Sequence, residues 1–490
     1  MTFARIFRNG RRRNRPASRR KFAYAPWINA FAVICIGLPA VAAGAETVAV
    51  GDYELAVATP RPAPAHPFPD NMTMEIPAPE SVGFHAQSTV VKQYHPGFSA
   101  IYSGANSLDP VARWAQTVDL TLFLGLRLDD NTEFWINPEI DQGSGLNNTL
   151  GVAGFPSGEA YKVGANVPYV RLPRAFFRRV IDLGGETLVT DSGPNQLAGT
   201  HQSDNLTITA GKFAVVDIFD TNTYAHDPRA DFLNWAVIES GAFDYAADSW
   251  GYTYGAATEW NVSRWTLRGG VFALSETPNG KKPDASFRQQ MFVAELERRH
   301  QWREHDGKLK LLAFINRANM ASYADAVRAA ALTGGTPDVS TVRRFASRPG
   351  IALNFEQEVT ADLGVFARAS MNDGSKESFD FTDINKSVSG GFALKGTSWN
   401  RPRDTLGVAA VINGLSGDAQ SYFANGGLGV LVGDGQLNYR TERILETYYA
   451  LQLDHGVAIS LDYQYVQNPA YNRDRGSVSL FGIRLHADFR

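Results

Sequence analysis

The last segment of the chain, residues 481–489, alternates strictly between two kinds of side chain. Every odd position is apolar, whereas the even positions are Gly482, Arg484, His486 and Asp488. Because successive side chains of a strand point to opposite faces, one face of this segment is apolar and the other is polar. A strand of about nine tilted residues crosses a bilayer, and outer-membrane barrels usually carry an aromatic residue at this end. A half-buried strand of a soluble protein would alternate in the same way, so this segment alone leaves both structures open.

The beginning of the chain predicts export. A basic stretch, residues 11–21, precedes an apolar run from about Phe31 to Ala43, and the run closes on Ala43-Gly44-Ala45. These are the three parts of a secretory signal peptide, and the apolar run is too short to span a bilayer comfortably. We therefore expect residues 1–45 to be a signal peptide that is cleaved after Ala45.

The remaining composition excludes several classes of protein. The only cysteine, Cys35, lies in the expected signal peptide, so the mature chain can form no disulfide. No other stretch approaches the roughly 18 apolar residues of a transmembrane helix, which excludes a helical membrane protein. The 47 basic and 50 acidic residues nearly balance, so nothing indicates a nucleic-acid surface. Residues 46–80 are rich in proline and alanine, which predicts an N-terminal arm or linker or, equally, a disordered segment.

From Ser81 onward, short segments of alternating polarity are separated by clusters of glycine, asparagine, aspartate and proline. This pattern is typical of a many-stranded antiparallel sheet. In residues 119–128 every even position is leucine, whereas the odd positions include Asp119 and Arg127. A soluble sandwich rarely carries arginine and aspartate through the middle of long strands, but the polar face of a membrane barrel lines a lumen. We therefore expect residues 81–490 to form one transmembrane antiparallel β-barrel, with 16 strands at about 25 residues for each strand and its connection.

One segment departs from the strand pattern. Residues 321–332 are rich in alanine and predict a short helix in a connection between strands. Such a helix is equally compatible with a surface loop and with a loop that narrows the lumen.

The residues also carry a resemblance that runs nearly from end to end. The matching blocks include Asp227-Pro228-Arg229-Ala230-Asp231-Phe232-Leu233-Asn234-Trp235 and Glu442-Arg443-Ile444-Leu445-Glu446, together with residues 84–87, 102–108, 124–128, 137–139, 151–156, 211–213, 217–220, 243–248, 251–253, 399–404, 462–465 and 468–476. In this order they resemble the carbohydrate-selective porin family (OprB-like) of Gram-negative outer membranes. The resemblance implies a largely monomeric, 16-stranded barrel that lets mono- or oligosaccharides diffuse across the outer membrane. Its further partners would be outer-membrane lipid and the barrel-assembly machinery.

Two features differ from the pattern of that family. Family members typically end on phenylalanine, whereas here Arg490 follows Phe489. Pro173 lies inside residues 171–179, a stretch that resembles a family segment, and proline is unusual inside a central strand. Pro173 therefore predicts an edge, a bulge or an inward loop at this position.

A sugar channel needs paired hydrogen-bond donors and acceptors at its narrowest point, and binding weak enough to allow release. We expect Arg127, Glu139, Arg171, Arg174 and Trp135 to line the channel. Arg127 falls opposite the leucine face, and Glu139 and the two later arginines lie in blocks that resemble the family. Salt bridges that tie down an inward loop would explain these charges equally well. Trp135 would also suit the aromatic belt at the membrane interface.

Two other functions stay open as alternatives. The first is a general diffusion porin without sugar selectivity. The second is a structural or adhesive barrel whose lumen is plugged, with the proline-rich arm and the alanine-rich helix as candidate plugs. We expect no enzyme, because the sequence has no Gly-x-Ser-x-Gly elbow and only His300 and His305 approach the spacing of metal ligands.

We also expect no cofactor and no metal. Asp217 and Asp220 are three residues apart and would lie on opposite faces of a strand, which argues against a shared cation. The charged clusters of residues 227–231 and 472–475 are better explained by loop-to-wall ion pairs than by a role in transport.

Overall fold

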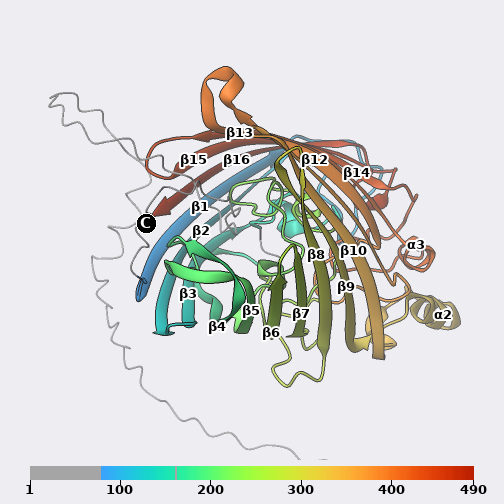
Figure 1. Ribbon diagram of the computed structural model, residues 1–490. Coiled ribbons are helices and arrows are strands. Elements are labelled where there is room, and N and C mark those ends of the chain that lie inside the picture. The colour runs from blue at the N-terminus through green and yellow to red at the C-terminus, as the bar shows by residue number, and fades with distance from the viewer. Residues whose placement is uncertain (1–78, 161–162, 490) are drawn as a thin grey trace, which may run out of the picture. The chain divides into compact units, whose positions relative to one another are not determined.

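A computed structural model describes residues 79–160 and 163–489 (Figure 1). The expected signal peptide, all but the last two residues of the expected arm, and Arg490 lie outside the described residues. Within the described residues, 16 strands close into one antiparallel barrel in which each strand pairs with its neighbours in sequence and β1 pairs with β16. The predicted barrel with 16 strands is confirmed.

The strands are β1 (Val82–His95), β2 (Arg113–Asp129), β3 (Thr132–Ser144), β4 (Ala165–Thr190), β5 (Gly199–Phe213), β6 (Thr253–Val262), β7 (Trp265–Ala273), β8 (Gln290–Trp302), β9 (His305–Met320), β10 (Arg344–Thr360), β11 (Leu363–Asn372), β12 (Lys386–Gly396), β13 (Arg401–Gly414), β14 (Glu442–Gln452), β15 (Val457–Gln467) and β16 (Val478–Phe489). The α-helices are α1 (Trp235–Ile238), α2 (Tyr323–Thr333) and α3 (Gly417–Ala424), and short 3-10 helices occupy Leu146–Thr149, Val215–Asp217, Val339–Thr341, Thr397–Trp399 and Pro469–Tyr471.

The two ends of the barrel differ in the length of their connections. At one end, which we call the turn end, most strands are joined by two to four residues, as between Val262 and Trp265. At the other end, the loop end, the longest connection is residues 214–252, which we call the long loop. Because the strands alternate in direction, every connection that contains an α-helix lies at the loop end.

Helix α2 confirms the prediction of a helix at residues 321–332. It begins after Ser322, whose side chain accepts a hydrogen bond from the backbone N–H of Asp325, and it ends at Gly334 in the left-handed conformation. Helix α3, in the connection between β13 and β14, was not expected from the sequence. Among the described residues, no helix has the length and apolar character needed to cross a membrane.

The outer face of the barrel is apolar, as the alternation of the sequence predicts. Leu126 and Leu128 of β2 are 45% and 50% exposed, whereas Asp119 and Thr121 of the same strand are 3% and 0% exposed. The same alternation holds in β16, where Phe481, Ile483 and Leu485 are exposed and Arg484 is buried. An apolar belt around the outside is what a barrel in a lipid bilayer requires.

Loops from the loop end fold into the barrel and form a core there (Figure 1). The long loop is largely buried, and its Trp235 stacks on Phe155 from the connection between β3 and β4, with ring centroids 5.3 Å apart. Phe381, from the connection between β11 and β12, packs on Trp235 at 5.4 Å and on Tyr245 of the long loop at 4.6 Å. Three loops that are distant in sequence therefore share one aromatic cluster inside the ring of strands.

Charged residues on the inner wall hold the long loop in place through its backbone. Glu446 of β14 accepts hydrogen bonds from the N–H groups of Leu233 and Asn234, at 2.5 and 3.2 Å from one carboxylate oxygen. Arg484 of β16 donates to three backbone carbonyl oxygens in residues 228–231. Hydrogen bonds from an ionised donor such as Arg484 are stronger than neutral ones, and together these bonds fix the path of the loop.

Residues 227–231 and 472–475 therefore anchor loops, partly by ion pairs of Arg229 with Glu159 and of Arg475 with Asp434, and partly by hydrogen bonds to backbone carbonyls. Arg475 donates to the carbonyl oxygens of Tyr102 and Leu108. The view of Asp217 and Asp220 as strand residues was wrong, because Asp217 belongs to the 3-10 helix Val215–Asp217. In residues 79–160 and 163–489, no group of His, Cys, Asp and Glu side chains has the arrangement of a metal site.

Candidate channel constriction

Three of the residues expected to line the channel lie together on the inner wall formed by β3 and β4. Arg171 donates from Nη2 to Oε1 of Glu139 at 2.5 Å, and it also pairs with Asp141 through Nε. Thr121 of β2 donates its hydroxyl to the other oxygen of Glu139 at 2.7 Å. Glu139 is thus a buried carboxylate whose two oxygens are both hydrogen-bonded.

Arg174 lies beside this group and faces the long loop. Its guanidinium forms a two-pronged pair with Asp217, with Nε–Oδ2 and Nη2–Oδ1 distances of 2.8 and 2.6 Å. The side chains of Arg174 and Asp217 are 14% and 29% exposed, so this pair remains in contact with solvent inside the barrel. Burial raises the pKa of Asp217, but the charge of Arg174 and its hydrogen bonds outweigh burial and hold the pKa below its ordinary value.

Pro173 explains how two arginines three residues apart both point inward. The pairing of β3 with β4 shifts register between the Asn137–Arg174 and Glu139–Arg171 pairs, which is a β-bulge. Of the edge, bulge or inward loop expected at Pro173, the structure shows the bulge. A bulge places one extra residue in one strand and re-aims the side chains beside it, so Arg171 and Arg174 reach carboxylates on the same side of the sheet.

Two aromatic rings lie against these arginines. The guanidinium carbon of Arg171 is 5.3 Å from the ring centroid of Trp250 and 5.5 Å from that of Tyr252, and Arg174 is 5.0 Å from Tyr252. Trp250 donates its indole N–H to the hydroxyl of Tyr169 at 3.1 Å. We call Glu139, Asp141, Arg171, Arg174, Asp217, Trp250 and Tyr252 the constriction cluster.

A further ion-paired group joins two inward loops near this cluster. Arg229 of the long loop lies 3.4 Å from Glu159, in the connection between β3 and β4, and 3.5 Å from Asp227. Burial raises the pKa of Asp227, but the opposing charge of Arg229 keeps it below its ordinary value. Lys212 pairs with Asp248 at 3.5 Å. These ion pairs join the two loops to each other and the long loop to β5.

Sequence reasoning missed four members of the site, namely Asp141, Asp217, Trp250 and Tyr252. Tyr252 lies in a block, residues 251–253, that resembles the porin family, but Trp250 has no such signal. Asp141 was identifiable by strand parity, because it follows Glu139 by two residues and therefore shares its face.

Arg127 and Trp135 lie elsewhere, at the turn end. Arg127 faces inward as its parity predicts, but it donates to the carbonyl oxygens of Glu80 and Ala198 at 2.8 and 3.0 Å. Trp135 also points inward and is 0% exposed, so its assignment to the outer aromatic belt was wrong. Its indole N–H donates to Glu133 at 3.0 Å, and its ring presents no exposed face to a sugar in this conformation. We call Arg127, Glu133 and Trp135 the turn-end cluster.

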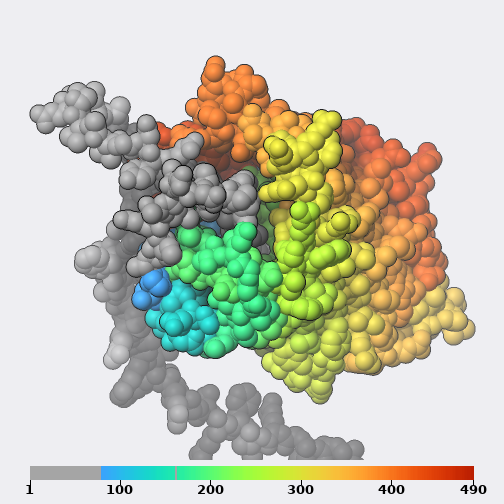
Figure 2. Space-filling view, viewed as in Figure 1, coloured from blue at the N-terminus to red at the C-terminus, as the bar shows by residue number. Residues whose placement is uncertain are grey.

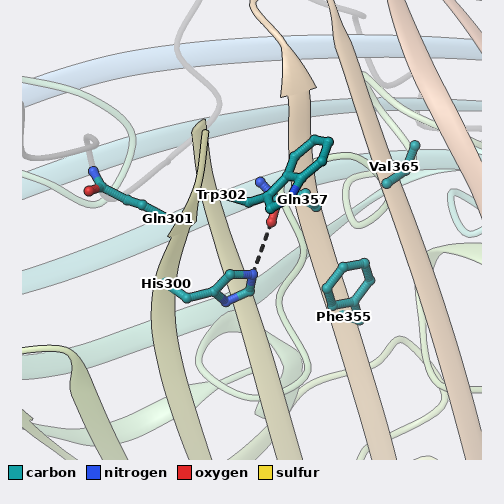
Figure 3. A pocket seen from close by; sticks show the side chains of 6 residues that line it. All are labelled: His300, Gln301, Trp302, Phe355, Gln357 and Val365. Carbon is teal, nitrogen blue, oxygen red and sulfur yellow. Dashed lines mark hydrogen bonds between the residues drawn. The ribbon is translucent and has the colours of Figure 1, made fainter. Parts of the chain in front are cut away.

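A cavity of ≈ 450 Å³ near the turn end lies outside the lumen (Figure 3). It is lined by His300, Gln301, Trp302, Phe355, Gln357 and Val365. His300 shares its strand face with the exposed Leu296, and Phe355 shares its face with the exposed Leu353. A hydrogen bond of 2.9 Å between His300 and Gln357 crosses this outward surface. The cavity therefore faces the side of the apolar belt and is no part of a route through the barrel.

Comparison with solved structures confirms the fold. Over 84% of this chain and 94% of the other, the barrel is similar to the high-pH structure of Pseudomonas putida OprB, with 16% identity and a TM-score of 0.64. The outer membrane channel DcaP of Acinetobacter baumannii matches at 10% identity over 83% of this chain and 97% of its own, with a TM-score of 0.45. The anion-selective porin of Comamonas acidovorans matches at 8% identity over 84% and 100%, with a TM-score of 0.46.

The sequence itself identifies the family. Among curated proteins, the comparison gives no match to this chain. The model of one protein family, the carbohydrate-selective porin OprB family, matches residues 105–489, which is most of the barrel. With its closed ring of 16 strands and its apolar outer belt, this chain is an outer-membrane β-barrel that belongs to the carbohydrate-selective porin family OprB.

Proposed function

We propose that this porin lets carbohydrates diffuse passively and selectively into the periplasm, and that the constriction cluster is where they are recognised. The observation that carries the proposal is the pairing of Arg174 and Asp217, which offers a charged donor fork and an acceptor to solvent beside the ring of Tyr252. A pyranose has hydroxyl groups around its rim and an apolar face. Paired donors and acceptors beside an aromatic ring match both features.

The charge balance of the cluster supports a neutral permeant. Arg171 and Arg174 face the carboxylates of Glu139, Asp141 and Asp217, so each cation has at least one opposing charge within the cluster. A compensated set of charges holds a free ion less firmly than a bare charge would. A sugar hydroxyl gains hydrogen bonds here without a charge of its own, and each bond is weak enough to permit release.

Each residue of the site has its own role in this proposal. Arg171 and Arg174 donate to sugar oxygens, Asp217 accepts from sugar hydroxyls, and Trp250 and Tyr252 supply stacking faces, whereas the buried Glu139 holds Arg171 in position. Arg127 and Trp135 act at the turn end, away from these groups. We further infer that the chain is exported through a cleaved signal peptide, is inserted by the barrel-assembly machinery and functions as a monomer.

Single-channel conductance in a planar bilayer tests the proposal. The refolded protein is titrated with glucose, with maltose and with an uncharged non-sugar of similar size. We expect a sugar to block the current in a concentration-dependent way and the non-sugar to leave it unblocked. Equal block by the non-sugar, or steady current with every solute, would leave a general diffusion porin.

A plugged barrel is the second candidate, because one observation favours it. The aromatic cluster of Phe155, Trp235, Tyr245 and Phe381 lies inside the ring of strands and is almost fully buried. If these loops close the lumen, the same bilayer experiment gives no conductance at any salt concentration.

A further inference from the structure

Strands β4 and β5 continue beyond the wall of the barrel. The pairing of β3 with β4 ends at Arg179, and the pairing of β5 with β6 ends at Asn205. Beyond these points, residues 184–190 of β4 and 199–204 of β5 pair only with each other. They form a two-stranded ribbon at the turn end, and we call residues 180–204 the exit hairpin.

The exit hairpin is bent near its base. Its pairing shifts register on both sides of Gly184, and Gly184 and Gly185 have φ angles of +129° and +89°. These backbone conformations suit glycine and strain other residues. The two glycines thus let the ribbon leave the direction of the wall, and in Figure 1 the green ribbon turns toward the blue and cyan strands β1–β3.

The tip of the hairpin contacts side chains that point into the barrel. Ser192 lies 3.1 Å from Nε2 of His85, an inward residue of β1 that is 6% exposed. Leu197 is 2% exposed and lies against Gly83 and the ring of Trp135, where a Cβ added to Gly83 would come within 2.7 Å of the Leu197 side chain. The tip therefore sits inside the mouth of the barrel, against its inner wall.

The turn-end cluster holds the backbone of this tip. The carbonyl oxygen of Ala198 accepts from Arg127 at 3.0 Å, and that of Asn195 accepts from Arg178 at 2.7 Å. Glu133 lies 3.5 Å from Arg127 and 4.0 Å from Arg178, so one carboxylate faces both cations. Glu80 adds a reciprocal pair of hydrogen bonds with the backbone of Ala198.

We propose that the exit hairpin is a second constriction, separate from the constriction cluster, which sets the upper size of the sugar that leaves the lumen. The short turns of outer-membrane barrels face the periplasm, so the turn end is the exit for a solute that enters from outside. The hairpin fills part of that exit on the side of β1–β3, and Figure 2 shows its green residues next to the cyan and blue ones of these strands. Arg127 and Trp135 are positioning residues that act through the hairpin. The role in sugar exit rests on the proposed function of the channel.

Deletion of the hairpin is the first test. Removing residues 186–202 joins Gly185 to Ser203 and leaves a short turn between β4 and β5. We expect the single-channel conductance to rise by roughly twofold, because conduction depends on pore width. Oligosaccharides too long to pass the native channel should enter liposomes that contain the deletion variant. Heat-modifiable migration on a gel confirms that the variant has folded.

Chemical bridging is the second test, and it keeps the whole hairpin. Cys35 is first replaced by Ser, which leaves a chain without cysteine. His85→Cys and Ser192→Cys are then combined and treated with a short bifunctional thiol reagent. We expect efficient bridging, with conductance and size limit held at the native values. Each single-cysteine variant is the matched control, because it reacts with the reagent but forms no bridge.

The outcomes separate the two proposals. Unchanged conductance and an unchanged size limit in a folded deletion variant would overturn the second constriction, even if sugars still block the channel. Failure of the two cysteines to bridge would also overturn it, because the tip would then lie away from β1. Raised conductance in the deletion variant without sugar block in any variant would support the constriction and contradict sugar recognition.

Discussion

The constriction cluster and the turn-end cluster contain the same kinds of residue but have different roles. Both place an arginine beside a carboxylate and an aromatic ring on the inner wall. At the constriction, Arg174 pairs with the partly exposed side chain of Asp217 and faces the ring of Tyr252. At the turn end, the N–H groups of Arg127 donate largely to backbone carbonyl oxygens, and Trp135 is completely buried. The carboxylate of the constriction is the more exposed of the two, with Asp217 at 29% and Glu133 at 14%, and the ring of Trp135 has no exposed face, so the constriction cluster is the better suited to sugar recognition.

The largest expected effect is on assembly of the barrel, and it tests whether both clusters lie on the inner face. Leu124 shares the outward face of β2 with Leu126, and Leu124→Arg would place a charge in the apolar belt. We expect a cost of about 2–4 kcal/mol near the bilayer midplane and impaired assembly. The measurement is the yield of heat-modifiable folded protein in lipid. Normal folding of this variant would mean that the inner and outer faces are reversed.

The next effect tests the packing of the turn-end cluster. A Cβ at Gly125 would lie 2.5 Å from the ring of Trp135, which is closer than atoms can approach. We expect Gly125→Ala to cost about 1–3 kcal/mol and to loosen Leu197 from its contact, with a rise in conductance. Gly269→Ala is the matched control, because the nearest atom to its added Cβ is 3.8 Å away. Equal behaviour of the two variants in urea unfolding would contradict the tight packing.

A pair of arginine variants sharpens the comparison itself. We expect Arg174→Ala to weaken sugar block up to roughly tenfold, because a hydrogen bond contributes about 0.5–1.5 kcal/mol net, and to leave the open-channel current little changed. We expect Arg127→Ala to do the reverse, with altered current and unaltered block. Arg403→Ala serves as the control, since Arg403 and its partner Asp454 are 52% and 79% exposed. The same phenotype in both lumen variants would remove the distinction between the clusters.

The smallest expected effect is on the pH dependence of sugar block, which should change only at acidic pH. The pKa of Asp217 is below its ordinary value of 3.8, although burial opposes this, because Arg174 favours the ionised form. The stabilisation from this pair is present above pH 3.8 and is lost as the pH falls through the folded-state pKa. Sugar block in the native channel should therefore persist down to about pH 4.

The same titration in the Arg174→Ala variant provides the contrast. Without the arginine, burial is opposed mainly by the hydrogen bond from the N–H of Ala214, so the pKa of Asp217 rises and sugar block is lost at a higher pH than in the native channel. Identical pH profiles would show that Asp217 takes no part in sugar binding.

Strand parity predicted which side of the wall a residue faces, but it could not predict depth along the barrel or the partner of a side chain. Arg127 and Arg174 were both expected in the lumen, yet one lies at the turn end and the other beside the long loop. Trp135 was assigned to either the sugar path or the outer belt, and its indole lies instead in contact with two glycines, Gly83 and Gly125. These glycines lie on neighbouring strands, so their proximity depends on strand register, which one sequence does not show.

The sequence by itself determined the closed barrel, its apolar outer face, a helix near residues 321–332 and an irregularity at Pro173, which the structure shows to be a bulge. Each follows from local chemistry: a period of two in polarity, the helix propensity of alanine, and the missing N–H of proline. The tertiary structure alone decided the constriction, because Arg174 and Asp217 are separated by 43 residues, and Arg127 and Ala198 by 71. Contacts of that range depend on how loops fold inside the ring of strands. Buried backbone groups and charges must all find partners there, and many sequences satisfy that requirement in different ways.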